Sequence, residues 1–335
     1  MICFDSKPRT LKAGQADGLQ PRTLEVFQSL NLAHEILTES CHMTEVAFWN
    51  PKSNSADGAK ETESGSRGIE RTSFVPDVVV DARFKHEITI HQGRIERILD
   101  ENICRYSKRG IVRSTDFEHF EIDAASDPEY PVKITLSSLT DGAIKDSNAA
   151  RRTVRAKYLV GADGAHSRVR KSMGLKLEGE TTDHIWGVLD FVSDTDFPDI
   201  RKRCAIHSDA GSIMVIPRER IPTGEYLTRL YVQIKQEIPT DVNENLEAEN
   251  AYKVSSKQRR SAITYQSILS QAEKVMYPYK IGLKAGTEPD WFAAYQIGQR
   301  MTPEFTMKDS EGIERVFIVG DGKLQMRKIQ IKRFC

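Results

Sequence analysis

The stretch that decides the fold is YLVGADGAHSRVR at residues 158–170. An apolar run leads into Gly161 and then into Asp163-Gly164, which predicts a buried strand ending in a tight turn. Glycine at such a turn lets the backbone approach a ligand closely. Ser167 is a suitable cap for a helix that follows directly. The Asp163 carboxylate could accept hydrogen bonds from ligand hydroxyls or from amides of its own turn, and residue types alone leave both roles open.

A second apolar strand of the same kind, VFIVGD at residues 316–321, also ends in Gly-Asp. Open α/β sheets bind their ligands at the carboxyl ends of the strands. The two motifs together therefore predict a nucleotide site that involves Asp163 and Asp321. Residues 1–5 form a further short apolar run ending in a carboxylate, Asp5, which suits the end of a buried parallel strand.

Periodicity predicts the other elements. Apolar residues at helical spacing predict one helix over residues 22–37, and alternation predicts antiparallel strands at 117–122 and 132–136. Further strand-like runs occupy residues 185–192 and 227–234. The chain therefore reads as an α/β protein with a large antiparallel insertion.

Composition excludes several classes of protein. The 335 residues carry 48 basic and 48 acidic side chains, so no global charge favours nucleic acid or an anionic membrane. With 39% hydrophobic residues the chain can form a sizeable core, yet no apolar run approaches the roughly 18 residues of a membrane span. Five scattered cysteines indicate reduced thiols and a cytoplasmic location, and neither a metal-ligand spacing nor a nucleophile-elbow motif is present.

Taken in order, these motifs resemble the flavin-dependent aromatic hydroxylases of the p-hydroxybenzoate hydroxylase fold. The fungal and yeast phenol 2-monooxygenase branch is the closer match. The resemblance covers about residues 1–322, and it rests on the two strand-end motifs together with four others: GQADGL at 14–19, HQGRIER at 91–97, DHIWGVL at 183–189 and IPRE at 216–219.

The resemblance implies a Rossmann-like FAD-binding domain, lacking its first βα unit, and an antiparallel-sheet substrate domain. The implied FAD-binding domain is discontinuous and comprises residues 1–40, 87–182 and 311–322. The implied substrate domain comprises residues 41–86 and 183–310, and a tail outside the family pattern occupies residues 323–335.

The implied catalytic residues are Asp17, Tyr231 and Arg218. Asp17 is similar to the family's carboxylate that helps to ionise the phenol hydroxyl. A phenol with a pKa near 10 becomes a better nucleophile when a neighbouring base takes its proton. Tyr231 is similar to the tyrosine that contacts substrate and flavin. Arg218 and Arg229 resemble basic groups near the flavin.

The resemblance implies FAD as cofactor, NADPH and O₂ as co-substrates, and a phenolic small molecule as substrate. The residues that it places against FAD are Asp5, Gly14, Gln15, Ala16, Gly18, Leu19, Gln92, Asp163, Tyr231 and Asp321. No metal, nucleic acid or membrane is implied. The oligomeric state stays open, with a homodimer as one outcome.

This chain departs from the sequence pattern of the family in two ways. No G-x-G-x-x-G turn, the usual pyrophosphate site, occurs in the 335 residues, and the sequence after Gly320-Asp321 does not continue as the family does. We therefore expect a chain truncated at both ends. One alternative is an inactive remnant or incomplete gene model with little FAD binding, and another is a different flavin monooxygenase of the same fold.

Overall fold

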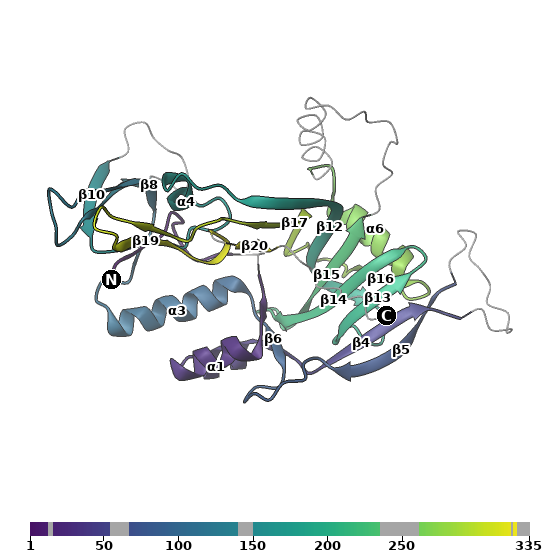
Figure 1. Cartoon of the computed structure of the whole chain (residues 1–335). Coiled ribbons are helices and arrows are strands. Elements are labelled where there is room, and N and C mark those ends of the chain that lie inside the picture. Colours follow the sequence, from purple (N-terminus) through teal and green to yellow (C-terminus); the bar gives the residue numbers. More distant parts are fainter. Residues whose placement is uncertain (13–15, 54–66, 140–149, 235–260, 323, 327–335) are drawn as a thin grey trace, which may run out of the picture. The chain divides into compact units, whose positions relative to one another are not determined.

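The computed structural model describes residues 1–12, 16–53, 67–139, 150–234, 261–322 and 324–326, which form two compact units (Figure 1). Unit 1 contains Met1–Thr10, Leu99–Asp183 and the described residues from Ile297 onward, and unit 2 contains Leu11–Ile98 and His184–Gln296. The predicted domains divide the chain elsewhere, since residues 11–40 and 87–98 belong to unit 2. The FAD-binding and substrate-binding roles of the predicted domains stay predictions.

Unit 1 combines two parallel strand pairs with an antiparallel sheet. Strand β1 pairs with β7, and β11 pairs with β19, both in parallel. The antiparallel sheet has the order β10-β9-β8, and β18 pairs with β19. The bounds are β1 Cys3–Phe4, β7 Ile111–Val112, β8 Thr115–Ile122, β9 Val132–Ser138, β10 Arg151–Ala156, β11 Leu159–Gly161, α4 Arg168–Ser172, β18 Thr306–Lys308, β19 Glu314–Ile318, η1 Gly320–Gly322 and β20 Leu324–Met326.

The strand–turn–helix predicted from residues 158–170 is confirmed, but its strand is not buried as predicted, because Val160 is 59% exposed. Strand β11 ends at Gly161, and Ser167 caps α4 by accepting a hydrogen bond from the Arg170 amide at 3.0 Å. A Cβ atom at Gly161 would lie 2.7 Å from Cβ of Val169, so the close approach of strand and helix requires glycine. Strand β11 is separate from β10, which ends at Ala156 and pairs with β9, whereas β11 pairs with β19.

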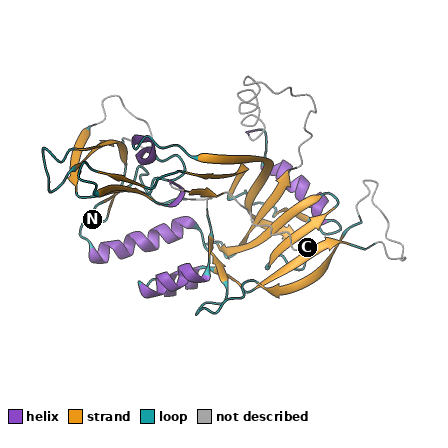
Figure 2. Cartoon of the chain, in the orientation of Figure 1, coloured by secondary structure: helices purple, strands orange, loops and turns teal. Residues whose placement is uncertain are grey.

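Unit 2 is built on a mainly antiparallel sheet in the order β17-β12-β15-β14-β13-β4-β5, with β16 pairing β12 (Figure 2). A small sheet of order β2-β6-β3 accompanies it. The boundary between the units falls within α3, β12 and β17. The bounds are β2 Gly18–Leu19, α1 Pro21–Ser29, α2 Ala33–Glu39, β3 Cys41–Met43, β4 Glu45–Pro51, β5 Ile69–Pro76, β6 Glu87–Thr89, α3 Gln92–Tyr106, β12 Glu178–Thr195, β13 Arg203–Ser208, β14 Gly211–Arg220, β15 Tyr226–Ile234, α6 Tyr265–Met276, β16 Ile281–Leu283 and β17 Trp291–Met301.

One face of the unit 2 sheet packs against α6. Alternation along β12 and β15 places Leu189, Phe191, Leu230 and Val232 in the same hydrophobic cluster as Ile268 of α6. All five side chains are fully buried. The alternate residues of these strands lie on the opposite face of the sheet, which carries the charged residues described below.

The expected mixed α/β fold is confirmed, but the helix predicted over residues 22–37 is two helices. Between α1 and α2 the chain turns at Asn31, whose φ is +59°. This left-handed conformation ends a helix, and asparagine tolerates it better than most residues. Within the described residues, no helix combines the length and apolar character that a membrane span requires.

Gly187 provides a test of the packing between β12 and α6. A Cβ atom at Gly187 would lie 2.7 Å from Cγ1 of the buried Ile268 side chain. We expect Gly187→Ala to lower the free energy of unfolding by about 1–3 kcal/mol through overpacking. Gly282→Ala is the matched control, because the nearest atom to its Cβ position is 3.9 Å away. Urea unfolding that ranks the two variants equally would contradict this packing.

Candidate functional site

The face of the unit 2 sheet that points away from α6 gathers charged side chains on three neighbouring strands. On β12 and β15, Asp190 lies directly opposite Arg229 in the antiparallel register. Arg229 in turn pairs with Ile216 of β14, and alternation places Arg218 on the face of Ile216. Asp190, Arg218 and Arg229 are each 0% exposed. Charges buried this completely must be paired with one another.

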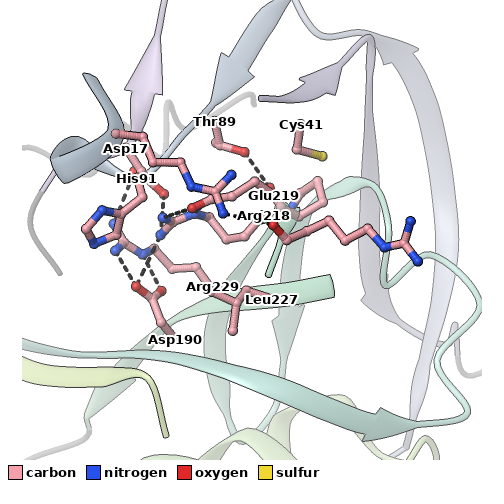
Figure 3. A network of polar contacts seen from close by, with 12 residues as sticks. Asp17, Cys41, Thr89, His91, Asp190, Arg218, Glu219, Leu227 and Arg229 are labelled. Atoms are coloured by element: carbon pink, nitrogen blue, oxygen red, sulfur yellow. Dashed lines mark hydrogen bonds and ion pairs between the residues drawn. The ribbon is translucent and has the colours of Figure 1, made fainter. Parts of the chain in front are cut away.

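Arg229 uses all three of its nitrogens. Its Nε and Nη2 both donate to the Asp190 carboxylate at 2.6 Å. Its Nη1 lies 3.1 Å from Oδ1 of Asp17 and donates to the Tyr231 hydroxyl at 3.3 Å. One guanidinium group therefore contacts two of the predicted catalytic residues, Asp17 and Tyr231. Figure 3 shows Asp17, Asp190 and Arg229 in this network.

Arg218 is held in a similar way by its neighbour in the chain. Its Nε and Nη2 donate to the Glu219 carboxylate at 2.9 and 3.1 Å. Its Nη1 lies 3.1 Å from Oδ2 of Asp190 and 3.2 Å from Oδ2 of Asp17. The predicted catalytic residues Asp17, Arg218 and Tyr231 are thus brought together by contacts with Arg229, Asp190 and Glu219. We call this set of residues the charged cluster.

Asp17 reaches the cluster from a short loop that backbone contacts hold over the sheet. Gly18 of β2 pairs with Thr89 of β6, and the Ile90 amide donates to the Asp17 carbonyl at 2.9 Å. The Thr89 hydroxyl donates to the Pro217 carbonyl at 2.7 Å, which ties β6 to β14 next to Arg218. Of the other loop residues predicted to contact FAD, Ala16 and Gly18 are exposed and Leu19 is half-buried. Gly14 and Gln15 lie outside the described residues.

The charges of the cluster do not balance. Three carboxylates (Asp17, Asp190 and Glu219) face two guanidinium groups, so 3 − 2 leaves one excess negative charge. Burial raises the pKa of Asp17 above its ordinary value, although Arg229 and Arg218 act to lower it. Oδ2 of Asp17 has no hydrogen-bond partner within the described part of the chain. Asp17 is therefore a buried carboxyl group with increased proton affinity, whose Oδ2 is paired with Arg218 at 3.2 Å but accepts no hydrogen bond from the described residues.

Other titratable groups around the cluster are also perturbed by burial. Burial raises the pKa of the Tyr231 hydroxyl, and Asp17 adds to the increase. Burial lowers the pKa of His91 despite the opposing effect of Glu219. Nδ1 of His91 accepts a hydrogen bond from the Gly93 amide at 3.0 Å, so the neutral ring carries its proton on Nε2, which has no partner among the described residues.

Gln92 lies at the start of α3 and belongs to a different set of contacts. Its side-chain amide donates to Glu96 at 3.0 Å, and the other oxygen of Glu96 accepts from the Leu11 amide at 3.0 Å. A Cβ atom at Gly93 would lie 2.0 Å from the Leu11 carbonyl oxygen, so this junction needs glycine. These contacts hold the start of α3 against the chain that enters the Asp17 loop.

In unit 1, the two strand-end carboxylates have different surroundings. Asp163 accepts hydrogen bonds from the Ser167 hydroxyl and from the amides of Arg168 and Val169, so its own turn occupies it. Asp321 is exposed and lies in η1, just after Gly320, whose φ is +60°. Because β11 and β19 are parallel, both turns lie at the same edge of their sheet.

A buried arginine holds these two turns. Arg170 is 5% exposed, and it donates to the carbonyl oxygens of Gly322 at 3.0 Å and Ala165 at 2.9 Å. At the other parallel pair, Asp5 follows β1 and accepts from the Lys7 amide at 2.9 Å and from Arg113 at 2.8 Å. Its side chain is 30% exposed, which leaves part of the carboxylate open.

Comparison with known families identifies this architecture. Residues 1–322 match the family model described as "FAD binding domain". The chain belongs to this family of FAD-binding domains. The resemblance read from the motifs is thereby confirmed.

Curated relatives of this FAD-binding chain are oxygenases. It is 34% identical over 324 residues to the flavin-dependent oxygenase ucdD of Aspergillus ustus, covering 96% of this chain and 45% of the relative. It is 33% identical to the phenol 2-monooxygenase fsqG of Aspergillus fumigatus and 31% identical to the 3-hydroxybenzoate 4-monooxygenase of Comamonas testosteroni, covering 95% of this chain and 45% of each relative. The chain thus spans about half the length of these relatives.

Solved structures agree on the fold. The p-nitrophenol 4-monooxygenase PnpA of Pseudomonas putida DLL-E4 matches with a TM-score of 0.63 at 17% identity, covering 96% of this chain and 66% of that one. The flavin-dependent monooxygenase PieE, solved with FAD and substrate, matches with a TM-score of 0.58 at 18% identity, covering 96% and 48%. At these identities the likeness concerns the fold alone.

The described residues of unit 1 fit the demands of FAD at two places. A carboxylate has about four acceptor positions, and Asp5 uses two of them within the chain, which leaves acceptors for ribose hydroxyls. The backbone at Gly164 and Gly320 is open, since a Cβ atom at either would meet nothing within 4 Å. Asp163 fits a supporting role better than direct contact, because its oxygens serve its own turn. Its predicted contact with the pyrophosphate stays a prediction.

Sequence reasoning missed Asp190, Glu219 and His91 as members or neighbours of the cluster. A signal for Asp190 was present, because it is the one charge in the apolar run IWGVLDFV at 185–192. Arg229 is likewise the only charge in LTRLYV at 227–232. Lone charges in two apolar strands predict a buried pair. Strand register, which the sequence did not reveal, is what places them opposite each other.

The raised pKa of Asp17 predicts a pH-dependent stability difference. The folded pKa lies above the unfolded value near 4, so the folded state binds the extra proton and loses stability as pH rises through that window, by about 1.4 kcal/mol per pH unit. Asparagine cannot ionise, so the stability of Asp17→Asn should increase relative to that of the wild type as pH rises. Urea unfolding from about pH 4 to about pH 8, a range that starts at the ordinary Asp pKa, measures the difference. A constant difference would contradict the raised proton affinity.

Proposed function

We propose that this protein is an FAD-dependent monooxygenase that hydroxylates a phenolic ring with NADPH and O₂. The observation that carries the proposal is the Asp17 carboxyl group, which is buried, has a raised pKa and accepts no hydrogen bond at Oδ2 from the described residues, while Tyr231 contacts the same arginine. Family membership supports the flavin part, and the names of the relatives support aromatic hydroxylation.

Asp17 is the base of the proposed reaction. A phenol hydroxyl has a pKa near 10, and an ordinary Asp near 4 is a poor match for its proton. Burial raises the pKa of Asp17 toward that of the phenol, which makes it a better general base. In its ionised form, Asp17 accepts the hydrogen bond of the phenol at Oδ2, to which no described residue donates, and then takes the proton. The ionised ring is the more electron-rich nucleophile.

The arginines and Tyr231 orient the substrate oxygen. Nη1 of Arg229 lies beside both Asp17 and the Tyr231 hydroxyl, so positive charge is present where the phenolate oxygen forms. The raised pKa of Tyr231 keeps its hydroxyl protonated, so that it can donate a hydrogen bond to that oxygen. Arg218 approaches Asp17 from the other side and restrains its carboxylate.

FAD, when bound, accepts reducing equivalents from NADPH and activates O₂ for transfer to the ring. In unit 1, the residues that would hold it are Asp5 and Asp321. We accordingly assign FAD binding to the strand-end turns of unit 1 and substrate binding to the charged face of unit 2.

Product analysis tests the function. The full chain, supplied with FAD and NADPH, should oxidise NADPH faster when a simple phenol is added and should release the corresponding catechol. Asp17→Asn should lower catechol formation by about 10²–10⁴-fold, the usual contribution of a general base, while phenol-independent reduction of FAD by NADPH continues. Catechol formation that survives Asp17→Asn would refute Asp17 as the base.

Two further results would separate the alternatives. Failure of the purified chain to take up FAD would support an inactive polypeptide over an enzyme. FAD uptake and NADPH oxidation without a catechol from any phenol would instead indicate another flavin monooxygenase chemistry.

A further inference from the structure

Asp190 lies at the centre of the charged cluster, yet it has no access to a substrate. Its side chain is 0% exposed on β12. Its two oxygens accept three hydrogen bonds, two from Arg229 and one from Arg218. Among the hydrogen bonds of the described residues in the cluster, Asp190 is thus the one carboxylate that accepts from both arginines (Figure 3).

The two arginines share one arrangement. Each is held on Nε and Nη2 by one carboxylate, Asp190 for Arg229 and Glu219 for Arg218. Such a two-point contact between planar groups fixes the orientation of the guanidinium. In both cases the remaining Nη1 faces Asp17, at 3.1 Å from Arg229 and 3.2 Å from Arg218.

We propose that Asp190 is a positioning residue: it orients Arg229 and Arg218 so that one nitrogen of each faces Asp17, and its charge sets the proton affinity of that carboxyl group. The proposal rests on the assignment of Asp17 as the base in the proposed function. Asp190 itself touches neither substrate nor cofactor.

The sign of the electrostatic effect follows from the charges. Asp190 raises the pKa of Asp17 as a nearby like charge, and it also takes up two donors of Arg229 and one of Arg218 that would otherwise stabilise the Asp17 anion. Without the Asp190 charge, two carboxylates would face two guanidinium groups. The excess negative charge would disappear, and Asp17 would ionise at lower pH.

The groups that face Asp17 come from several elements. Arg218 and Glu219 belong to β14, Arg229 and Tyr231 to β15, Asp190 to β12 and Tyr295 to β17. His91, just before α3, and Asp290, just before β17, are close enough to interact with Arg218, Glu219 and Asp190. The test therefore compares variants that differ at one of these groups only.

The first test needs no ligand. The effect of Asp17→Asn on stability is measured by urea unfolding as a function of pH, once in the wild-type background and once in the Asp190→Asn background. In the wild-type background, the protein that keeps Asp17 should lose stability relative to Asp17→Asn as pH rises. In the Asp190→Asn background, this stability difference should have its midpoint at a pH that is lower by about one unit or more. An unchanged midpoint would overturn the proposal.

Asp199→Asn is the matched control. Asp199 also lies in unit 2 and is 3% exposed. It accepts hydrogen bonds from the buried Trp49 indole and from Arg71, both at 3.0 Å. It has no contact with the charged cluster among the contacts of the described residues. Loss of stability is expected in Asp199→Asn as well, but the midpoint of the Asp17 effect should stay where it is in the wild type.

The second test separates geometry from charge and uses 4-nitrophenol, whose ionised form is coloured. Asp190→Glu keeps the charge but displaces the arginines, so it should weaken 4-nitrophenol binding by about 10–100-fold. Equal binding by Asp190→Glu and wild type would overturn the orienting role. A wild type that binds no 4-nitrophenol would count against the phenol assignment, whereas the urea experiment would still decide the role of Asp190.

Discussion

The structure of unit 2 depends on the need to satisfy two buried guanidinium groups. Arg218 and Arg229 are both 0% exposed, and removing one partner of such a buried pair typically costs about 3–5 kcal/mol. Asp190 and Glu219 meet most of this need from the sheet itself. Asp17 meets the rest from a separate loop, so the same ion pairs that stabilise the sheet also hold that loop in place.

This stabilising arrangement also creates the chemistry. Three carboxylates surround two guanidinium groups, and burial raises the pKa of one of them, Asp17. Oδ2 of Asp17 accepts no hydrogen bond from the described residues, whereas the two oxygens of Asp190 accept three. Residues with similar chemistry therefore act differently because of where the sheet places them.

Unit 1 uses a buried arginine differently. Arg170 donates to backbone carbonyls of two strand-end turns and leaves the Asp321 carboxylate exposed. Asp163 also follows a strand, where a carboxylate can contact a ligand. It instead accepts hydrogen bonds from amides at the start of α4. Asp5 keeps an open part beside Arg113. A strand-end carboxylate can thus support the turn or face a ligand, and only the hydrogen bonds distinguish the two.

The sequence by itself determined the mixed α/β class and the strand–turn–helix at 158–170, because alternation, capping and glycine placement act over a few residues. Its resemblance to a known family indicated the family and three residues, Asp17, Arg218 and Tyr231, that prove to be neighbours. Only the tertiary structure decided that Asn31 divides one predicted helix into two, and that Asp190 lies opposite Arg229. Pairings between distant segments depend on strand register, and no short stretch of sequence specifies that.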